Sequence, residues 1–301
     1  MLLGEAHDHD HRSRRSDNRK RLALILLLTS GYMVAEIVGG LVTNSLALLA
    51  DAGHMFSDVT ALGLSVFAIW IAERPPTPKW TYGFYRTEIL AALANGAALV
   101  AVSIFVFIEA YRRLLEPPVV MGSLMMAVAV GGLLINLAGL WILRSGRKDS
   151  LNVHGAWLHI LTDALGSVGA VVAGGLIWAF GWNWCDPAIS ALIGLLVIYS
   201  AWRLVAESVA VLMEGAPKGI DVDEVRQAML ETPGVASMHD LHVWTITSAL
   251  DSLSAHVVAD DGQPLAELLL RLRRSLRERF GISHTTIQIE PTDFADHPGP
   301  V

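Results

Sequence analysis

Six long segments of mostly apolar residues dominate this chain as far as Leu212. A helix needs about 20 such residues to cross the hydrocarbon core of a lipid bilayer. Clusters of proline, glycine and charged residues, which are typical of turns, separate the segments. The sequence therefore predicts an all-α membrane domain of six transmembrane helices and excludes a single soluble enzyme. The predicted spans are 22–42, 46–71, 87–110, 120–143, 153–179 and 186–212.

The composition changes after Leu212. Over all 301 residues 53% are hydrophobic and 17% are charged, against roughly 25% charged in soluble domains. The C-terminal part is more polar, and its order of elements, α-β-β-α-β, predicts a cytoplasmic α+β domain with a ferredoxin-like fold. Its expected elements are helices at 221–231 and 265–280 and strands at 241–246, 253–258 and 285–290. The predicted parts are an N-terminal arm (1–20), the transmembrane domain (21–212), the cytoplasmic domain (213–291) and a tail (292–301).

The distribution of lysine and arginine predicts the orientation in the membrane. If the N-terminus is inside, the outer loops contain only Arg112 and Arg113, and the other basic residues that flank the spans lie inside. Cytoplasmic loops carry the excess of positive charge in membrane proteins. We therefore expect both termini in the cytoplasm.

The net charge of −7 lies entirely in the C-terminal part. Lysine and arginine balance aspartate and glutamate at 15 each up to Leu212, and from Met213 onward they number 7 against 14. Such an acidic domain argues against nucleic acid as a partner and favours divalent metal ions. The single cysteine, Cys185, excludes an intrachain disulfide and a cysteine-based zinc cluster. The chain has no G-x-x-x-x-G-K-[ST] loop, so we expect no nucleotide.

A duplicated spacing is the strongest chemical signal. The second span carries His54 and Asp58, and the fifth carries His159 and Asp163. Residues four apart lie on one face of a helix, so the two helices together offer two nitrogens and two oxygens. This donor set suits tetrahedral zinc, and imidazole also suits cobalt and nickel. The alternative is two hydrogen-bonded helix contacts, but ionisable residues at membrane depth are costly, and two copies favour a metal site.

Three other carboxylates in the spans leave two interpretations open. Asp51 precedes His54 by three residues, and it either orients a ligand or relays protons, or caps a turn near the start of its span. Glu36 and Glu109 could line a vestibule or pair with polar partners near the membrane boundary. The sequence alone leaves both interpretations open for each of these carboxylates.

Histidines also gather in the C-terminal domain, on or beside its predicted strands. Strands bring distant residues together, so His239, His256 and Glu290 could converge on one or two metal ions, with His242 and His284 nearby. The alternative for each histidine is ordinary packing at the surface or in the core. We expect a metal site here.

The N-terminal arm contains a short histidine tract. Its histidines alternate with Asp8 and Asp10 and are His7, His9 and His11. Such a tract can bind zinc weakly, or it can be a dispensable tail. Both interpretations remain open.

Five stretches resemble the cation diffusion facilitator family, in particular its zinc-transporting branch of bacterial cobalt/zinc/cadmium efflux proteins and animal zinc transporters. The resemblance covers the chain from Arg21 to Pro291. The stretches are 45–58 (SLALLADAGHMFSD), 82–88 (YGFYRTE), 151–167 (LNVHGAWLHILTDALGS), 212–215 (LMEG) and 239–244 (HDLHVW).

The resemblance implies a homodimer in the bacterial inner membrane that exports Zn²⁺ in exchange for protons. It implies that the intramembrane His-Asp residues form the transport site, and that His239, His256 and Glu290 bind metal in the cytoplasm. Gln288 stands where some members have histidine, which puts the number of cytoplasmic metal ions in doubt. Arg86 and Glu214 resemble a charge pair that holds the dimer together.

Elementary chemistry supports this mechanism. Metal ligands must lose their protons to bind, and histidine titrates near 6.5, so a histidine ligand can exchange a proton for a metal ion. One alternative is a membrane-anchored zinc sensor that binds metal without moving it. Another is an intramembrane zinc hydrolase, but its His-Glu-x-x-His motif is absent. We therefore expect a transporter and no enzyme.

Overall fold

Long helices form most of the structure. The computed structural model describes residues 24, 26–72, 74–144, 151–247 and 250–292, and the N-terminal histidines His7, His9 and His11 lie outside them. The chain divides into two compact units. The helical unit contains Met1–Gly63 and Asn95–Trp202, and the tail unit contains Leu64–Ala94 and Arg203–Val301.

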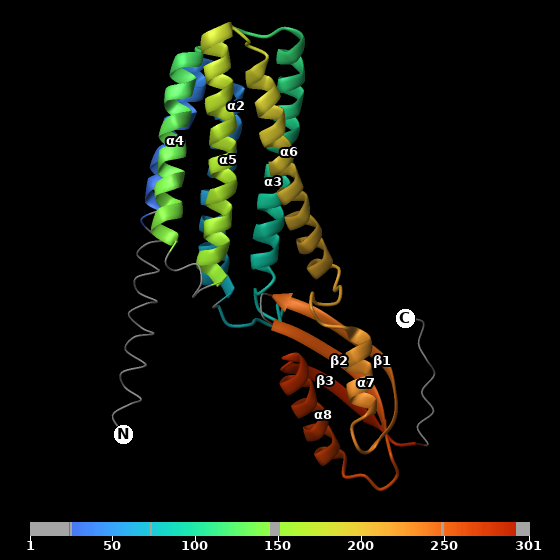
Figure 1. The fold of residues 1–301 in the computed structure, drawn as a ribbon. Coiled ribbons are helices and arrows are strands. Elements are labelled where there is room, and N and C mark those ends of the chain that lie inside the picture. Colours follow the sequence, from blue (N-terminus) through green and yellow to red (C-terminus); the bar gives the residue numbers. More distant parts are fainter. Residues whose placement is uncertain (1–23, 25, 73, 145–150, 248–249, 293–301) are drawn as a thin grey trace, which may run out of the picture. The chain divides into compact units, whose positions relative to one another are not determined.

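The predicted spans correspond to long helices that run side by side (Figure 1). Within the described residues, five helices are long and apolar enough to cross a membrane, but α2 is not among them. With 27 residues at about 1.5 Å each, α2 still exceeds the ~30 Å hydrocarbon core, so a sixth span stays a prediction based on its length. The helices are Leu26–Thr43, α2 (Leu46–Ala72), α3 (Thr87–Leu115), α4 (Gly122–Leu143), α5 (Leu151–Phe180) and α6 (Cys185–Leu212).

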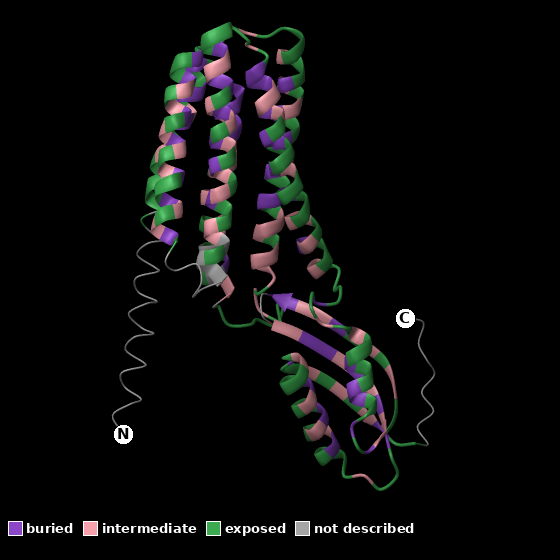
Figure 2. Cartoon of the chain, in the orientation of Figure 1, coloured by how far each residue is buried: buried purple, intermediate pink, exposed green. Residues whose placement is uncertain are grey.

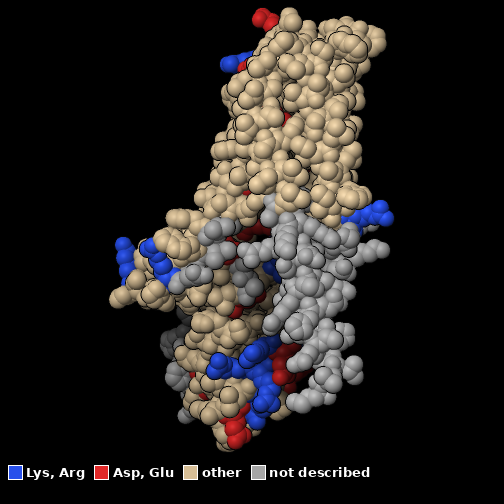
Figure 3. All heavy atoms as spheres, turned by 90° about the vertical axis from the view of Figure 1, so that its left-hand side faces the viewer, with Lys and Arg blue, Asp and Glu red and all other residues tan. Residues whose placement is uncertain are grey.

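The outer surface of these helices is apolar. Exposed residues occur along every long helix (Figure 2), and many of them are large and hydrophobic, such as Leu134, Trp141 and Trp178. On the face seen in Figure 3, charged side chains are sparse over most of the length of the helices. A soluble protein rarely exposes so large an apolar surface, so this surface is suited to lipid.

Small residues let α4 and α5 approach closely. A Cβ atom on Gly122 would lie 2.8 Å from the Gly174 carbonyl oxygen, and one on Gly174 would lie 2.9 Å from the backbone nitrogen of Met126. Asn136 of α4 also donates a hydrogen bond to Ser167 of α5 at 3.2 Å. Small residues and polar side chains are the usual means of helix association in membranes. This packing fixes α5, which carries one of the two His-Asp pairs.

A buried carboxylate from α6 caps the N-terminus of α2. Asp186 accepts hydrogen bonds from Ser45 Oγ at 2.6 Å and from the backbone nitrogens of Leu46 at 2.8 Å and Ala47 at 3.2 Å. Its Oδ2 also lies 3.9 Å from Nη1 of Arg113 on α3. A carboxylate at this position satisfies backbone donors and opposes the positive end of the helix dipole. The contact therefore ties together three helices of the helical unit.

The C-terminal elements have the predicted order, α-β-β-α-β. Strand β2 pairs antiparallel with β1 and parallel with β3, giving a three-stranded sheet in the order β1-β2-β3. Helices α7 and α8 pack against each other and contribute Val225, Leu268, Leu272 and Leu276 to a core shared with the sheet. The elements are α7 (Val222–Leu230), β1 (Val235–Thr247), β2 (Leu250–Ala259), α8 (Leu265–Phe280) and β3 (His284–Glu290).

Local signals set the boundaries of these elements. Asp221 caps α7 by accepting a hydrogen bond from the backbone nitrogen of Asp223 at 2.9 Å. Gly281 ends α8 in the left-handed conformation, with φ of 74°. Strand β1 begins six residues earlier than predicted, because register shifts between Val235 and Ser237 and between His239 and His242 let an irregular segment continue the pairing with β2.

Candidate metal centres

The two His-Asp pairs meet in the helical unit. His54 and Asp58 come from α2, and His159 and Asp163 come from α5. Within each helix, Nε2 of the histidine lies 3.6 to 3.7 Å from a carboxylate oxygen four residues later. Between the helices, His54 Nε2 lies 3.7 Å from Asp163 Oδ1, and His159 Nε2 lies 3.1 Å from Asp58 Oδ2. The four side chains therefore lie close together, and their role as metal ligands stays a prediction.

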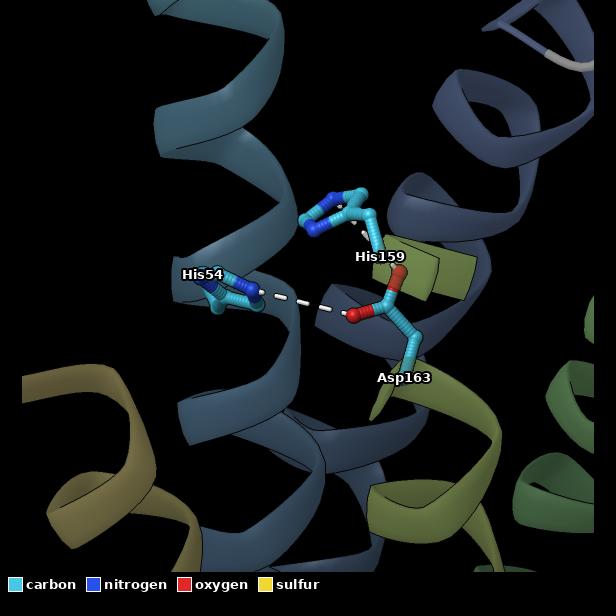
Figure 4. A group of neighbouring side chains, drawn as sticks. All are labelled: His54, His159 and Asp163. Carbon is cyan, nitrogen blue, oxygen red and sulfur yellow. Dashed lines mark ion pairs between the residues drawn. The ribbon is translucent and has the colours of Figure 1, made fainter. Parts of the chain in front are cut away.

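The donor atoms point toward a common centre. Figure 4 shows both imidazole rings turned toward the two oxygens of Asp163. Ligand atoms of His54, His159 and Asp163 all lie within 4.8 Å of one another, and Oδ2 of Asp58 contacts both histidines. His54 and Asp163 are mostly buried, and Asp58 and His159 are more accessible. An ion could therefore enter from one side and meet donors from both helices.

The spacing of these atoms fits a tetrahedral ion. Four bonds of about 2.0–2.1 Å in tetrahedral directions separate neighbouring ligand atoms by about 3.3–3.4 Å. The four nitrogen–oxygen distances at this centre are 3.1 to 3.7 Å. The donor set of two imidazoles and two carboxylates suits zinc and cobalt better than manganese. The centre can therefore bind such an ion with small side-chain adjustments.

The surroundings include residues that the sequence only partly indicated. A cavity of about 290 Å³ is lined by three of the four candidate ligands, by Asp51 and by residues of α6 such as Tyr199. Ser57, beside Asp58, donates a hydrogen bond to Asn95 Oδ1 of α3 at 2.9 Å. Both side chains are buried, so this bond helps to fix the rotation of α2. We did not predict it, although a buried asparagine in an apolar span is a detectable signal.

The three carboxylates whose roles the sequence left open differ in their interaction partners. Glu109 pairs with Arg113 at 2.9 Å, so it has the polar partner that one interpretation required. Asp51 is buried beside the candidate ligands, and it does not cap the start of α2, where Asp186 accepts the backbone hydrogen bonds. Glu36 is also buried, and its Oε2 has no hydrogen-bond partner among the described residues.

A second cluster lies on the sheet of the tail unit. His239 on β1 is paired in register with His256 on β2, and β3 supplies Glu290. His256 Nδ1 lies 2.8 Å from Glu290 Oε1, and His239 Nε2 lies 3.8 Å from Glu290 Oε2. Ligand atoms of all three residues lie within 4.8 Å of one another. Glu290 is only 2% exposed, so its charge is held beside two imidazoles and away from water.

A bulge in β1 brings a further carboxylate to this cluster. Asp240 has a φ of 52° and lies in the register shift between His239 and His242. Its Oδ1 lies 2.9 Å from His242 Nε2, and its Oδ2 lies 3.9 Å from His256 Nε2. The sequence did not indicate Asp240 as part of the cluster, because strict alternation would place it on the opposite face from His239. Bulges redirect side chains in this way.

The remaining predicted residues of the tail unit lie in different places. Gln288 donates a hydrogen bond to Glu290 Oε1 at 2.9 Å, so it orients the carboxylate. His284 lies at the opposite end of β3 from Glu290, where its ring contacts Tyr82 with centroids 5.9 Å apart. The structure therefore does not bring His284 to the cluster.

The predicted charge pair forms within one chain. Arg86 Nη2 lies 2.9 Å from Glu214 Oε1, and both side chains are substantially exposed. An exposed ion pair contributes about 0–1 kcal/mol to stability. This contact joins the loop before α3 to the residue that follows the end of α6, both in the tail unit.

The comparison with known proteins identifies the family. Residues 22–213 match the cation efflux transmembrane domain, and residues 217–292 match the cytoplasmic domain of cation efflux proteins. The chain belongs to the cation efflux family. The family suggested by the sequence motifs is thereby confirmed, and this cation efflux protein is an integral membrane protein.

Its relatives are similar over nearly their full length. The metal cation efflux system protein CzcD of Cupriavidus metallidurans is 47% identical over 98% of this chain and 93% of its own. A cadmium, cobalt and zinc/H⁺-K⁺ antiporter of Bacillus subtilis is 42% identical over 95% of this chain and 93% of its own. The zinc transporter ZitB of Escherichia coli is 42% identical over 95% of this chain and 92% of its own. The cation efflux protein described here is thus a relative of divalent metal transporters.

Proposed function

We propose that this protein exports Zn²⁺ from the cytoplasm in exchange for protons, with Co²⁺ and Cd²⁺ as further substrates. The observation that carries the proposal is the convergence of His54, Asp58, His159 and Asp163 between α2 and α5. Two carboxylates at this depth attract a divalent cation, and two imidazoles favour zinc over magnesium or manganese. The relatives named for zinc, cobalt and cadmium transport support the same substrates.

The ligands themselves provide a basis for exchange. A proton on His54 or His159 removes the lone pair that would bind the metal, so protonation and metal binding compete. Release of the metal on the more acidic side, followed by proton uptake, resets the site for the return to the cytoplasm. Transport further requires that the cavity open to one side at a time through movement of the helices around it.

The proposed arrangement places the protein in the bacterial inner membrane with both termini in the cytoplasm. It divides the chain into an arm (1–20), a transport domain (21–212), a metal-binding domain (213–291) and a tail (292–301). We further propose a homodimer, which the match to the cytoplasmic domain of cation efflux proteins supports. The energy source is the proton gradient, and no nucleotide or catalytic step is involved.

Uptake into proteoliposomes tests this function. The purified chain is reconstituted, a pH gradient that is acidic inside is imposed, and entry of Zn²⁺, Co²⁺, Cd²⁺ and Mn²⁺ is followed with a trapped fluorescent chelator. We expect zinc, cobalt and cadmium to enter only with the gradient, and manganese to enter much more slowly. Metal uptake that does not depend on the pH gradient would contradict exchange for protons.

The same experiment distinguishes a transporter from a membrane-anchored zinc sensor. A sensor would bind zinc with a measurable heat in calorimetry and yet move none across the bilayer. A metal site inside the membrane is unnecessary for such a sensor, which is why we favour transport. Bound zinc without any uptake in sealed, correctly reconstituted vesicles would reverse this preference.

The tail cluster is proposed as a cytoplasmic site for regulatory zinc. We expect Glu290→Gln to weaken zinc binding there by at least about tenfold, because the amide removes the charge that faces His239 and His256. Calorimetry on the full chain with Asp163→Ala in the background isolates this site. His284→Ala is the matched control and should leave the affinity unchanged, since His284 lies away from the cluster. Equal affinities for Glu290→Gln and the control would exclude the site.

A further inference from the structure

A cavity of about 320 Å³ in the tail unit has no part in either candidate metal centre. Most of its lining comes from the segment 79–86, which belongs to the connection between α2 and α3. Glu214, which follows α6, and Trp244 and Ile246 of β1 complete the lining. Pockets for small molecules usually measure about 300–1,000 Å³. This cavity can therefore hold a small polar group.

Backbone hydrogen bonds give the segment beside the cavity a defined shape. Thr77 and Trp80 exchange backbone hydrogen bonds of 3.0 and 3.1 Å, and the nitrogen of Gly83 donates to the Trp80 carbonyl oxygen at 2.9 Å. Gly83 has a φ of 70°, which suits glycine. The hydroxyl of Thr247, at the end of β1, donates to Glu88 Oε2 in the first turn of α3 at 2.6 Å. The connection and the strand are thus held together around a preformed cavity.

The cavity adjoins the ends of two helices that are apolar enough to cross a membrane. Helix α3 begins at the residue after Arg86, and α6 ends two residues before Glu214. With its 29 residues α3 is about 43 Å long, which matches the ~40–45 Å of a bilayer with its headgroup regions. The first turn of α3, and the cavity beside it, therefore lie at the level of the lipid headgroups.

Aromatic side chains make up much of the lining and are accessible. Trp80 is 51% exposed and Tyr82 is 53% exposed, and Tyr85 and Trp244 also line the cavity. Tryptophan and tyrosine concentrate at membrane–water interfaces, because each combines an apolar ring with a polar group. Their presence here indicates contact with the polar part of a lipid.

The charged groups of the lining leave one positive charge in excess. Arg86 donates from Nη2 to Glu214 Oε1 at 2.9 Å, but a guanidinium carries five N–H donors, so this one bond does not use them all. Lys79 Nζ lies 5.6 Å from the centre of the Trp80 ring, and Lys79 forms no ion pair among the residues that the structure describes. A phosphodiester group has one negative charge and therefore complements this lining.

We propose that this cavity binds the headgroup of an anionic phospholipid. Lys79 and Arg86 donate hydrogen bonds to the phosphate oxygens, and the rings of Trp80 and Tyr85 pack against the glycerol that joins the phosphate to the acyl chains. The volume accommodates the headgroup alone, so the acyl chains remain in the bilayer. The proposal depends on the membrane location of the protein and is independent of the metal that it transports.

Native mass spectrometry of the whole chain in detergent tests the site. Phosphatidylglycerol is titrated into the protein, and the affinity for the first bound lipid is measured. We expect Lys79→Gln combined with Trp80→Ala to weaken this affinity by at least about tenfold, because the variant loses a positive charge and a packing ring. Both side chains are exposed, so the fold should persist. The matched control, Arg112→Gln, removes an exposed arginine from the other end of α3 and should bind as the wild type does.

The choice of lipid provides a second readout. Phosphatidylcholine has no net charge, and we expect the wild type to bind it at least about tenfold more weakly than phosphatidylglycerol. Equal affinities for the two lipids would overturn the recognition of an anion. An unchanged affinity of the double variant for phosphatidylglycerol would overturn the site, and an equal loss in Arg112→Gln would replace it with general attraction to the protein surface.

Two other occupants of the cavity are distinguished in the same spectra. Millimolar inorganic phosphate should leave phosphatidylglycerol bound, and displacement of the lipid would assign the cavity to free phosphate. The double variant should keep the oligomeric state of the wild type. Its conversion to a smaller species, together with loss of the lipid, would assign the cavity to contact between copies of this chain.

Discussion

Asp163→Ala is expected to reduce gradient-driven zinc uptake to the level of empty liposomes, a fall of at least about 100-fold. Asp163 is the residue that faces both histidines with different oxygens, Oδ1 toward His54 and Oδ2 toward His159, each at 3.7 Å. Replacement of Asp163 by alanine leaves three of the four ligands and removes one negative charge that would attract a divalent ion. Measurement of initial uptake rates at several zinc concentrations separates weaker binding from slower movement.

Two further variants make this test specific. Asp163→Asn keeps the shape of the side chain and removes its charge, so it should also fail to transport if charge is essential. Glu116→Gln removes a carboxylate from the exposed connection between α3 and α4 and should transport as the wild type does. Uptake by Asp163→Ala close to the wild-type rate, in protein of equal folding, would show that the ion crosses elsewhere.

Asp186→Ala is expected to destabilise the folded protein by about 3 kcal/mol. The carboxylate is fully buried, and its loss leaves the Ser45 hydroxyl and the backbone nitrogens of Leu46 and Ala47 without their acceptor. Arg113 also loses a nearby negative charge. A shift of the melting temperature of roughly 6–12 °C corresponds to this loss for a domain of this size. Tryptophan fluorescence of the detergent-solubilised chain during heating measures it.

A graded series of variants tests the capping role of Asp186. Asp186→Asn retains one acceptor oxygen and should lose about half of the stability lost by alanine. Ser45→Ala combined with Asp186→Ala should cost less than the sum of the single variants, because both remove the same hydrogen bond. A melting temperature of Asp186→Ala equal to that of Glu116→Gln would show that water or another group satisfies the N-terminus of α2.

Local chemistry made much of the fold predictable. The lengths of the apolar segments determined the long helices, because a helix that crosses a bilayer must satisfy its own backbone and bury apolar side chains in lipid. Helix periodicity placed His54 with Asp58 and His159 with Asp163. The α-β-β-α-β order of the C-terminal domain, and the bounds of α8 with Gly281 at its end, also followed from short-range pattern.

The joining of distant segments was decided by the tertiary structure. One oxygen of Asp58 contacts both His54 and His159 only because α2 packs beside α5, and helix periodicity does not specify which helices become neighbours. The bulge that turns Asp240 toward His242 breaks the alternation on which strand prediction depends. The Asp186 cap likewise joins different helices. The sequence thus determined which chemical groups each helix and strand presents, because backbone geometry repeats locally, and packing between elements determined which groups meet.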